Sequence, residues 1–444
     1  MFIGTKARKS PVDRAIILPA VVLVVQSIPW FTARFRLRML VPFMLAYVVI
    51  SVWRCRWKAA PYLERRVTVR LLVSFVLFFS AYMVADTLCY REFNNTYFVP
   101  QVFGLFYIWL FHSLISENKI REIKILTLVS IGAMLIASLM GVTYLGDELN
   151  RDIIRDMTGG GVDDIDAAHA NLSGIGNFGF VYSLGLLVPA MAYAAICVKK
   201  LSIRVLFWIS ALAFFLYAYR SGFTILMVTV LAGFVFFSGA CFFPKYSYYK
   251  WVLWLCVVLL ISATLYPSFG NIVVSPLESL GYLTDNKNYL ERLESIVDAI
   301  QGTSVDAYAL DRTDRYWMSW KVFLRHPFFG ADLEAAAFMG GHSFVFDFLA
   351  KGGVFSFSFL IIFIFNYTKY LKVIVYPCSK YAQFLVEIYF LMVTIVCILN
   401  PLCSAIVYCC LFFMLPGMSL FFKDSAKDRR FRPVRIGPNA EVSM

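Results

Sequence analysis

The residues of this sequence that are best suited to chemistry are gathered in one stretch, 312–353. Its arginines and histidines are Arg312, Arg315, Arg325, His326 and His342, and tryptophans and tyrosines lie among them. A guanidinium group is permanently charged and binds two phosphate oxygens at once through its planar fork. An imidazole titrates near neutral pH and can take up or release a proton during a reaction. Together these residue types suit the binding of phosphate and the transfer of a proton.

The rest of the chain is strongly apolar. Of its 444 residues, 60% are hydrophobic and 16% are charged, and its mean hydropathy is +0.71. Soluble globular proteins hold about 25% charged residues, so the composition indicates a polytopic membrane protein. The ten cysteines fall mostly inside apolar runs and form no CxxC pair that would suggest zinc. We expect them to be small core residues.

Apolar runs long enough to cross about 30 Å of hydrocarbon predict the membrane spans. We expect about twelve of them, some short. They are placed at 15–31, 39–53, 69–85, 97–116, 125–145, 174–198, 205–219, 223–243, 251–268, 353–367, 382–399 and 404–422. The predicted fold is therefore all-α, with about twelve transmembrane helices and a large helical loop outside the cytoplasm.

Charge sets the orientation of these spans. With a cytoplasmic N-terminus, every inside loop is basic, as the positive-inside rule requires: 54–68, 117–124, 199–204, 244–250, 368–381 and the tail 423–444. The net charge of +13 then faces the cytoplasm and anionic lipid, and nucleic acid is not implied. Arg34, Arg36 and Arg38 are an exception, explained by a short re-entrant hairpin or by side chains that reach the headgroups.

This topology divides the chain into four parts. Residues 1–268 hold nine spans and the outer loop 146–173, residues 269–343 form a large extracytoplasmic loop, residues 344–422 hold three spans, and residues 423–444 form a basic cytoplasmic tail. We expect the chemistry in the outer loops. The acidic run "DDID" at 163–166 fits an exposed loop better than a metal site, so neither a metal nor a cofactor is expected.

Local signals divide the end of the large loop into two helices. A helix is predicted from about Arg312 to Arg325, and "HPFFG" at 326–330 should end it, because proline cannot continue the helix and glycine permits a turn. Ser343 is suited to cap a new helix that runs to Gly352. This arrangement would put His342 just outside a helix N-terminus.

The order of these elements resembles a known family. An arginine, an aromatic residue, "HPFFG", a short loop and "GHSFVFDFLAKGG" followed by a span are similar to the C-terminal motif of O-antigen ligases and Wzy-type polysaccharide polymerases. The resemblance is close over 312–353 and extends to the rest of the chain by topology. Upstream, "AYRSGF" places Arg220 where the family has an arginine at the outer end of a span, here in the order Arg-Ser-Gly instead of Ser-Arg-Gly. Ser343 stands where ligases usually have asparagine, which favours a polymerase.

The resemblance implies transfer of glycan from an undecaprenyl-pyrophosphate carrier outside the cytoplasmic membrane of a bacterium, without a metal. It assigns the catalytic base to His342 and pyrophosphate binding to Arg220, Arg312 and Arg315. Sugar contacts are expected from Tyr316, Trp317, Trp320 and Ser343. Because donor phosphate and acceptor hydroxyl must meet, Arg220, Arg312 and His342 should converge on one cavity.

Three functions are compatible with the sequence. A polymerase would join lipid-linked oligosaccharide repeats into O-antigen, capsule or exopolysaccharide, with a flippase and a chain-length regulator as partners. A ligase would move finished glycan onto lipid A core or a protein. A transporter or flippase of the same lipid would instead carry its charges near the bilayer midplane, at broken helices. The gathering of arginine and histidine in an outer loop favours the two enzymes over the transporter.

Overall fold

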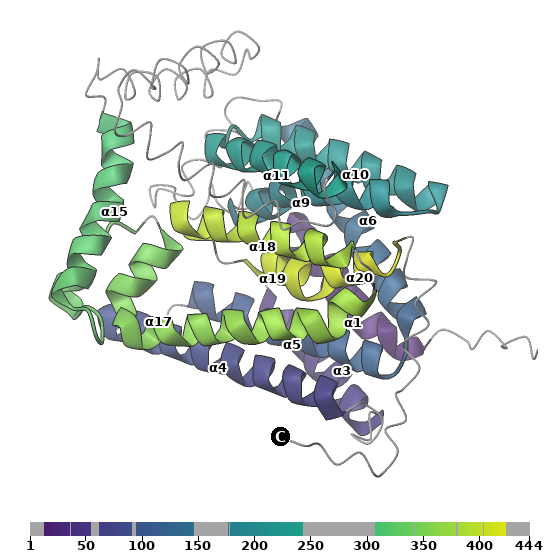
Figure 1. The fold of residues 1–444 in the computed structure, drawn as a ribbon, viewed down its shortest axis with the longest axis horizontal. Helices are drawn as coiled ribbons and strands as arrows, with labels where there is room; N and C mark the ends of the chain where they lie inside the picture. Colours follow the sequence, from purple (N-terminus) through teal and green to yellow (C-terminus); the bar gives the residue numbers. More distant parts are fainter. Residues whose placement is uncertain are drawn as a thin grey trace, which may run out of the picture.

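The structure is a computed structural model that describes residues 13–35, 37–54, 62–90, 95–145, 176, 178–242, 307–341, 343–378, 381–402 and 404–422. Apart from one isolated bridge between Val198 and Phe422, the regular secondary structure of these residues is helical (Figure 1). The predicted all-α fold is therefore confirmed for the part of the chain that is described.

The helices before the large loop follow the predicted spans. They are α1 (Ile17–Ser27), α2 (Pro29–Phe35), α3 (Val41–Arg54), α4 (Tyr62–Tyr90), α5 (Asn95–Ser116), α6 (Ile120–Tyr144), α9 (Phe178–Cys197), α10 (Leu201–Arg220) and α11 (Thr224–Phe242). Two helices lie within the predicted large loop, α15 (Ala307–Arg325) and α16 (Leu333–Ala336), and after it come α17 (Phe344–Tyr370), α18 (Ala382–Leu399), α19 (Ala405–Cys409) and α20 (Leu415–Ser419).

The described helices do not establish the predicted number of twelve membrane spans. Seven described helices are long and apolar enough to cross a membrane, and the three stretches Arg14–Ser27, Ile225–Gly239 and Ala405–Ser419 are apolar but shorter. The predicted span at 251–268 and the tail 423–444 lie outside the described residues. The count of twelve is therefore not established.

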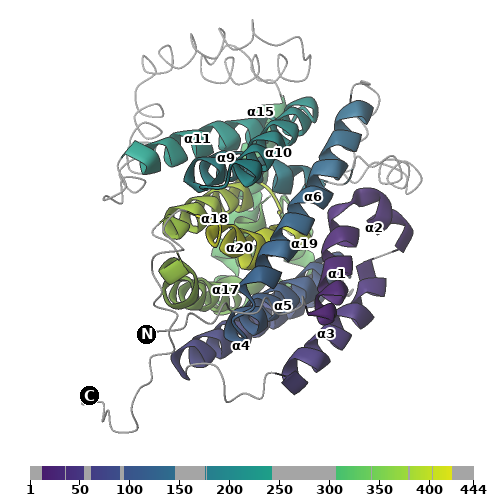
Figure 2. The same ribbon diagram turned by 90° about the vertical axis from the view of Figure 1, so that its right-hand side faces the viewer.

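The helices pack as a bundle around α9, α18 and the α19–α20 segment, whose side chains are mostly buried (Figure 2). Helix α9 packs against α10 and α11, and α17 packs along α4. Helices α10, α4 and α17 lie at the periphery and expose apolar side chains, among them Leu212, Leu88 and Phe365. Exposed apolar surface on long helices is what contact with lipid requires.

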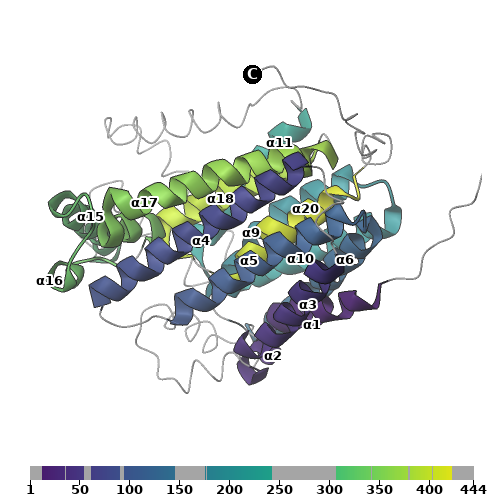
Figure 3. The ribbon, with the colours of Figure 1, turned by 90° about the horizontal axis from the view of Figure 1, so that it is seen from below.

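One end of the bundle is closed by helices that do not follow its long direction. Helix α15 lies crosswise to α17, and α16 lies near it at the same end (Figures 1 and 3). Helix α15 packs on α17, and α16 packs on the end of α4. We call this the outer end; it also holds the last residue of α18, because the Tyr316 hydroxyl donates a hydrogen bond to the Leu399 carbonyl at 2.7 Å.

Helix α17 is broken near the outer end. Gly353 has φ 61° and ψ −170°, which divides α17 into a short first half and a long second half. A side chain is strained at this φ, and a Cβ on Gly353 would overlap the Phe328 carbonyl. The break lies where the sequence predicted the boundary between the capped helix and the following span, and the predicted stop of α15 at "HPFFG" is also confirmed.

The "HPFFG" turn at 326–330 supplies partners for the backbone groups that the break sets free. The Val354 N–H donates to the Pro327 carbonyl at 2.8 Å, and the Phe355 N–H donates to the Phe328 carbonyl at 3.1 Å. The Ala331 N–H in turn donates to the Ala350 carbonyl at 2.9 Å. Buried backbone groups without partners are costly, so this exchange of hydrogen bonds permits the break.

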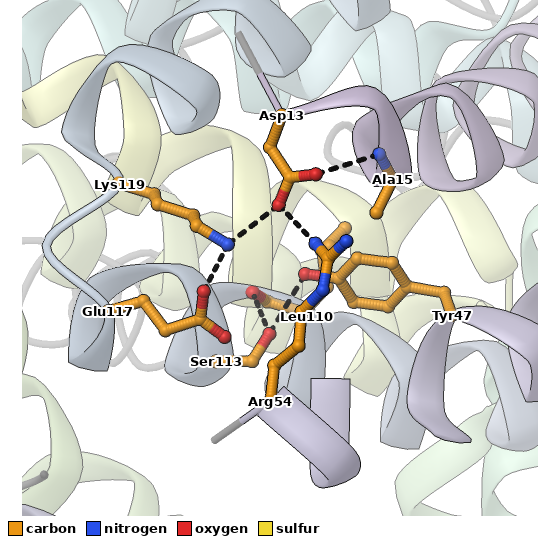
Figure 4. A network of polar contacts seen from close by, with 8 residues as sticks. All are labelled: Asp13, Ala15, Tyr47, Arg54, Leu110, Ser113, Glu117 and Lys119. Atoms are coloured by element: carbon orange, nitrogen blue, oxygen red, sulfur yellow. Dashed lines mark hydrogen bonds and ion pairs between the residues drawn. The ribbon is translucent and has the colours of Figure 1, made fainter. Parts of the chain in front are cut away.

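At the opposite end, an ionic network ties the first helix to the rest of the bundle (Figure 4). The Asp13 carboxylate accepts hydrogen bonds from Arg54 at 2.5 Å and from Lys119 at 2.7 Å, and Lys119 also pairs with Glu117. Burial alone would raise the pKa of Asp13, but the hydrogen bonds from Lys119, Arg54 and the Ala15 N–H hold it well below its ordinary value. Asp13 is therefore ionised in the folded protein even in moderately acidic solution.

We predict that Gly353→Ala destabilises the protein by about 1–3 kcal/mol from backbone strain, with a further loss from overlap with Phe328. Gly132→Ala is the matched control, because Gly132 lies within α6 and a Cβ there would meet no atom within 4 Å. Thermal unfolding of the purified variants checks this. Equal melting temperatures for the two variants would show that the break is not required.

We predict that Asp13→Asn lowers stability at neutral pH by about 1 kcal/mol, since charged hydrogen bonds are lost and Arg54, 40% exposed, is partly screened by water. Because the folded pKa is depressed, the wild-type advantage is complete above the ordinary Asp pKa of 3.8 and shrinks as the pH falls below it. Melting temperatures from pH 7 to pH 3 test this, with the exposed Glu334→Gln as control. A constant difference across that range would contradict it.

Candidate functional site

The candidate site is the unit that the two halves of the sequence motif form at the outer end. We call it the outer-end unit and define it as residues 315–341 and 343–355. It comprises most of α15, the "HPFFG" turn, α16 and the first half of α17. Each segment is bound to another by hydrogen bonds or by ring contacts, so the unit forms a continuous support for a site.

A buried carboxylate holds the centre of the unit together. Asp347 accepts a hydrogen bond from the Ser319 hydroxyl on α15 at 2.6 Å and one from the Ser343 N–H at 3.0 Å. The Ser319 hydroxyl also accepts a hydrogen bond from the Gly340 N–H at 3.0 Å. Ser319, Ser343 and Asp347 are all buried. Asp347 therefore joins α15, the end of the preceding loop and the start of α17.

These bonds fix the chain on both sides of His342. Gly340 lies so close to the Arg315 carbonyl that a Cβ at this position would overlap it. Ser343 is held on the other side by Asp347. His342 itself lies outside the described residues. Its described neighbours are Gly340, which is bound to Ser319 on α15, and Ser343, which is bound to Asp347 on α17.

Ser343 forms the predicted cap of α17. Its hydroxyl accepts a hydrogen bond from the Phe346 N–H at 3.1 Å and contacts the Cys397 carbonyl at 3.5 Å. The hydroxyl is thus engaged within the protein, and the residue is buried. The capping role is confirmed, whereas its predicted contact with sugar stays a prediction.

The three aromatic residues expected to contact sugar differ in their surroundings. Tyr316 and Trp320 pack against Phe346 with ring centroids 6.0 and 6.2 Å apart. Trp317 is 52% exposed, and the Lys321 ammonium lies 5.9 Å from its ring. Of the three, Trp317 offers the most surface to a molecule from outside, while Tyr316 and Trp320 connect α15 to α17.

The arginines expected to bind pyrophosphate are not all gathered in the unit. Arg315 lies on α15 and is half-buried. Arg220 ends α10 and donates a hydrogen bond to the Val142 carbonyl on α6 at 2.7 Å. Arg312 lies on α15, but its side chain, like that of His342, lies outside the described part of the chain. Convergence of Arg220, Arg312 and His342 therefore stays a prediction, and Arg315, Tyr316, Trp320 and Ser343 are the predicted residues brought together.

A buried ion pair that joins the unit to α4 was not predicted from the sequence. The Lys351 ammonium lies 2.6 Å from Asp86 on α4, and their side chains are 8% and 1% exposed. The ammonium also lies 4.7 Å from the ring centroid of Tyr90, and Cys89 donates to the Ala331 carbonyl at 3.3 Å. Buried charges are retained when they are paired. This pair fixes α4 to the first half of α17.

The second oxygen of Asp86 is buried and has no hydrogen-bond partner among the described residues. An unmet acceptor of this kind is costly unless a donor reaches it. The signal in the sequence was the presence of Asp86 and Lys351 inside apolar runs, where ionisable residues are expected to be functional or paired. The sequence did not indicate that the two residues are partners.

Among the described residues, no group of three or more histidine, cysteine, aspartate or glutamate side chains is placed to hold a metal ion. The acidic run at 163–166 lies outside those residues. Comparison of the chain with protein-family models and with curated proteins finds no match. The candidate site is therefore defined by its own residues and their contacts.

We predict that Asp347→Asn loosens the segment around His342, because an amide NH2 group cannot accept the hydrogen bonds that the carboxylate accepts. Loss of a hydrogen bond to a charged group costs about 1.5–3 kcal/mol. Amide hydrogen exchange in peptides that cover 338–346 should therefore become about 10- to 100-fold faster. Mass spectrometry of the exchanged protein measures this.

Asp332→Asn is the control for this change. Asp332 is exposed and caps α16 by accepting the Ala335 N–H, a bond that asparagine also makes. Amide hydrogen exchange at 338–346 in Asp332→Asn should equal that of the wild type. If Asp347→Asn leaves exchange in this segment unaltered, Asp347 does not hold it.

Proposed function

We propose that this protein is a glycosyltransferase, a polysaccharide polymerase that joins undecaprenyl-pyrophosphate-linked oligosaccharide repeats outside the cytoplasmic membrane. One observation carries the proposal: the motif of the O-antigen ligase and polymerase superfamily is present in order, and its two halves form one hydrogen-bonded unit at the end of an apolar helical bundle. That the matched residues belong to one structural unit supports their resemblance to a single motif.

The proposed reaction is a direct displacement at the anomeric carbon of the donor sugar. The acceptor hydroxyl oxygen forms a bond to that carbon while the bond from the carbon to the pyrophosphate oxygen breaks. His342 takes the proton of the hydroxyl. Arg312 and Arg315, with Arg220, bind the pyrophosphate and stabilise the charge that grows on it. One displacement of this kind inverts the configuration at the anomeric carbon.

The contacts of the unit support this assignment of roles. A base must be held within hydrogen-bond reach of its substrate, so the segment that carries it needs a rigid frame. Asp347 and Ser319 supply that frame on both sides of His342.

The positions of charge in the described spans favour transfer over transport. Their Asp, Glu, Lys, Arg and His side chains lie within about two turns of a span end. The buried pair of Asp86 and Lys351 follows this pattern, because both residues lie near the outer end. A transporter of a charged lipid is expected to carry such groups near the midplane.

The acceptor distinguishes a polymerase from a ligase. We assign the polymerase because Ser343 occupies the position where ligases usually carry asparagine. On this proposal, the substrates on both sides of the reaction are lipid-linked glycans, the partners are a flippase that delivers them and a chain-length regulator, and the protein resides in a bacterial inner membrane.

We predict that His342→Ala slows chain extension by about 10²–10⁴-fold, the usual contribution of a positioned base, while donor binding is retained. Arg312→Lys should also lose activity, because an ammonium keeps the charge but not the fork. The measurement is extension of a lipid-linked repeat by purified protein reconstituted in vesicles, with and without EDTA.

His326→Ala and Arg325→Lys are the matched controls, since His326 lies in the turn and Arg325 is exposed at the end of α15. Both should retain most of the activity. Full activity of His342→Ala would eliminate the proposed base. If EDTA abolishes the activity and a divalent ion restores it, a metal ion and not the arginines is the main group that neutralises the pyrophosphate.

A further inference from the structure

The outer-end unit exposes a set of large apolar side chains. Phe328 and Phe329 in the turn are 71% and 80% exposed. On α15, Leu324 is 56% exposed and Trp317 is 52% exposed. Single exposed apolar residues are common, but two adjacent phenylalanines at the tip of a turn are costly in water. Something apolar is therefore expected to cover them.

The turn continues the exposed apolar face of α17. The hydrogen bonds from Val354 and Phe355 hold the turn against the start of the second half of α17. The Phe329 and Phe355 rings have centroids 5.8 Å apart, and the Phe355 and Phe359 rings follow at 5.4 Å. Along this candidate membrane span, Phe355 and Phe365 are 57% and 58% exposed. The phenylalanines of the turn thus extend a surface that faces lipid.

The outward face of α15 has the composition of a membrane-surface helix. Trp317, Lys321, Leu324 and Arg325 recur at spacings that put them on one side, and all four are exposed. Tryptophan, lysine and arginine are typical of the layer where headgroups meet hydrocarbon. The crosswise position of α15 at the end of the bundle is the one that a helix in the plane of the membrane surface would take (Figure 1).

We infer that the "HPFFG" turn is a membrane anchor, which inserts Phe328 and Phe329 into the hydrocarbon of the adjacent leaflet while the outward face of α15 lies among the lipid headgroups. The occupant is bilayer lipid and not a protein partner, because the surface is continuous with the exposed face of a span and because Lys321 and Arg325 suit lipid phosphates. The inference does not depend on the proposed glycosyl transfer.

The test uses the wild-type protein in vesicles of phosphatidylcholine and phosphatidylglycerol. One preparation contains a lipid with a photoreactive diazirine at the end of an acyl chain, and another contains a lipid with the diazirine on its headgroup. After illumination, mass spectrometry locates the adducts. We expect the acyl probe to label Phe328 and Phe329 at least half as strongly as Phe365, and the headgroup probe to label the segment 317–325.

Two further conditions make the test decisive. A water-soluble diazirine should label Phe328 and Phe329 at least fivefold less than the acyl probe does. The variant Phe328→Ser/Phe329→Ser should lose acyl labelling of the turn while labelling of Phe355 and Phe365 persists, which also reports that the variant is folded. Labelling of the turn by the aqueous probe instead of the acyl probe would overturn the anchor, and so would protection of the turn from both probes, which contact with a second copy of the chain would give.

Discussion

A helix that breaks where its backbone is buried must find new hydrogen-bond partners for the groups that the break sets free, and this requirement organises the outer end of the protein. At Gly353 the chain leaves the helical conformation. The N–H groups of Val354 and Phe355 then depend on carbonyls of the "HPFFG" turn, and the Ala350 carbonyl depends on Ala331. A buried backbone group without a hydrogen-bond partner is costly, so the turn and the break stabilise each other.

The candidate site follows from that dependence. Because the turn is fixed to α17, α15 is brought across the end of the bundle, where Ser319 can reach Asp347. Asp347 in turn holds Ser343, the residue after His342. The pair of Asp86 and Lys351 fixes the same half of α17 to α4. The hydrogen-bond requirement at Gly353 is thereby linked, through this series of contacts, to the segment that carries the proposed base.

Sequence reasoning succeeded where the signal was local. Proline and glycine in the turn, the capping serine and the glycine pair at 352–353 each restrict a few consecutive residues, so the C-terminal end of α15 and both halves of α17 could be predicted. The start of α15 was placed near Arg312, but the helix begins at Ala307. It failed where the partner is distant: Asp86 and Lys351 are separated by 265 positions. Residue types suited to the site could also be named from sequence. Their convergence depends on how helices pack, which a single sequence does not encode locally. The predicted number of spans is not established, because short apolar runs are ambiguous.

The most direct test of the central claim is amide hydrogen exchange at Ala331, Val354 and Phe355 in the protein reconstituted in bilayers, resolved by solid-state NMR. If the turn and the break of α17 satisfy each other, these three amides exchange slowly, and Gly353 shows the chemical shifts of a positive φ. An unbroken α17 would also protect the Val354 and Phe355 amides, but it would leave the Ala331 amide without the Ala350 carbonyl and would give Gly353 helical shifts. Fast exchange at Ala331, together with helical shifts at Gly353, would contradict the claim.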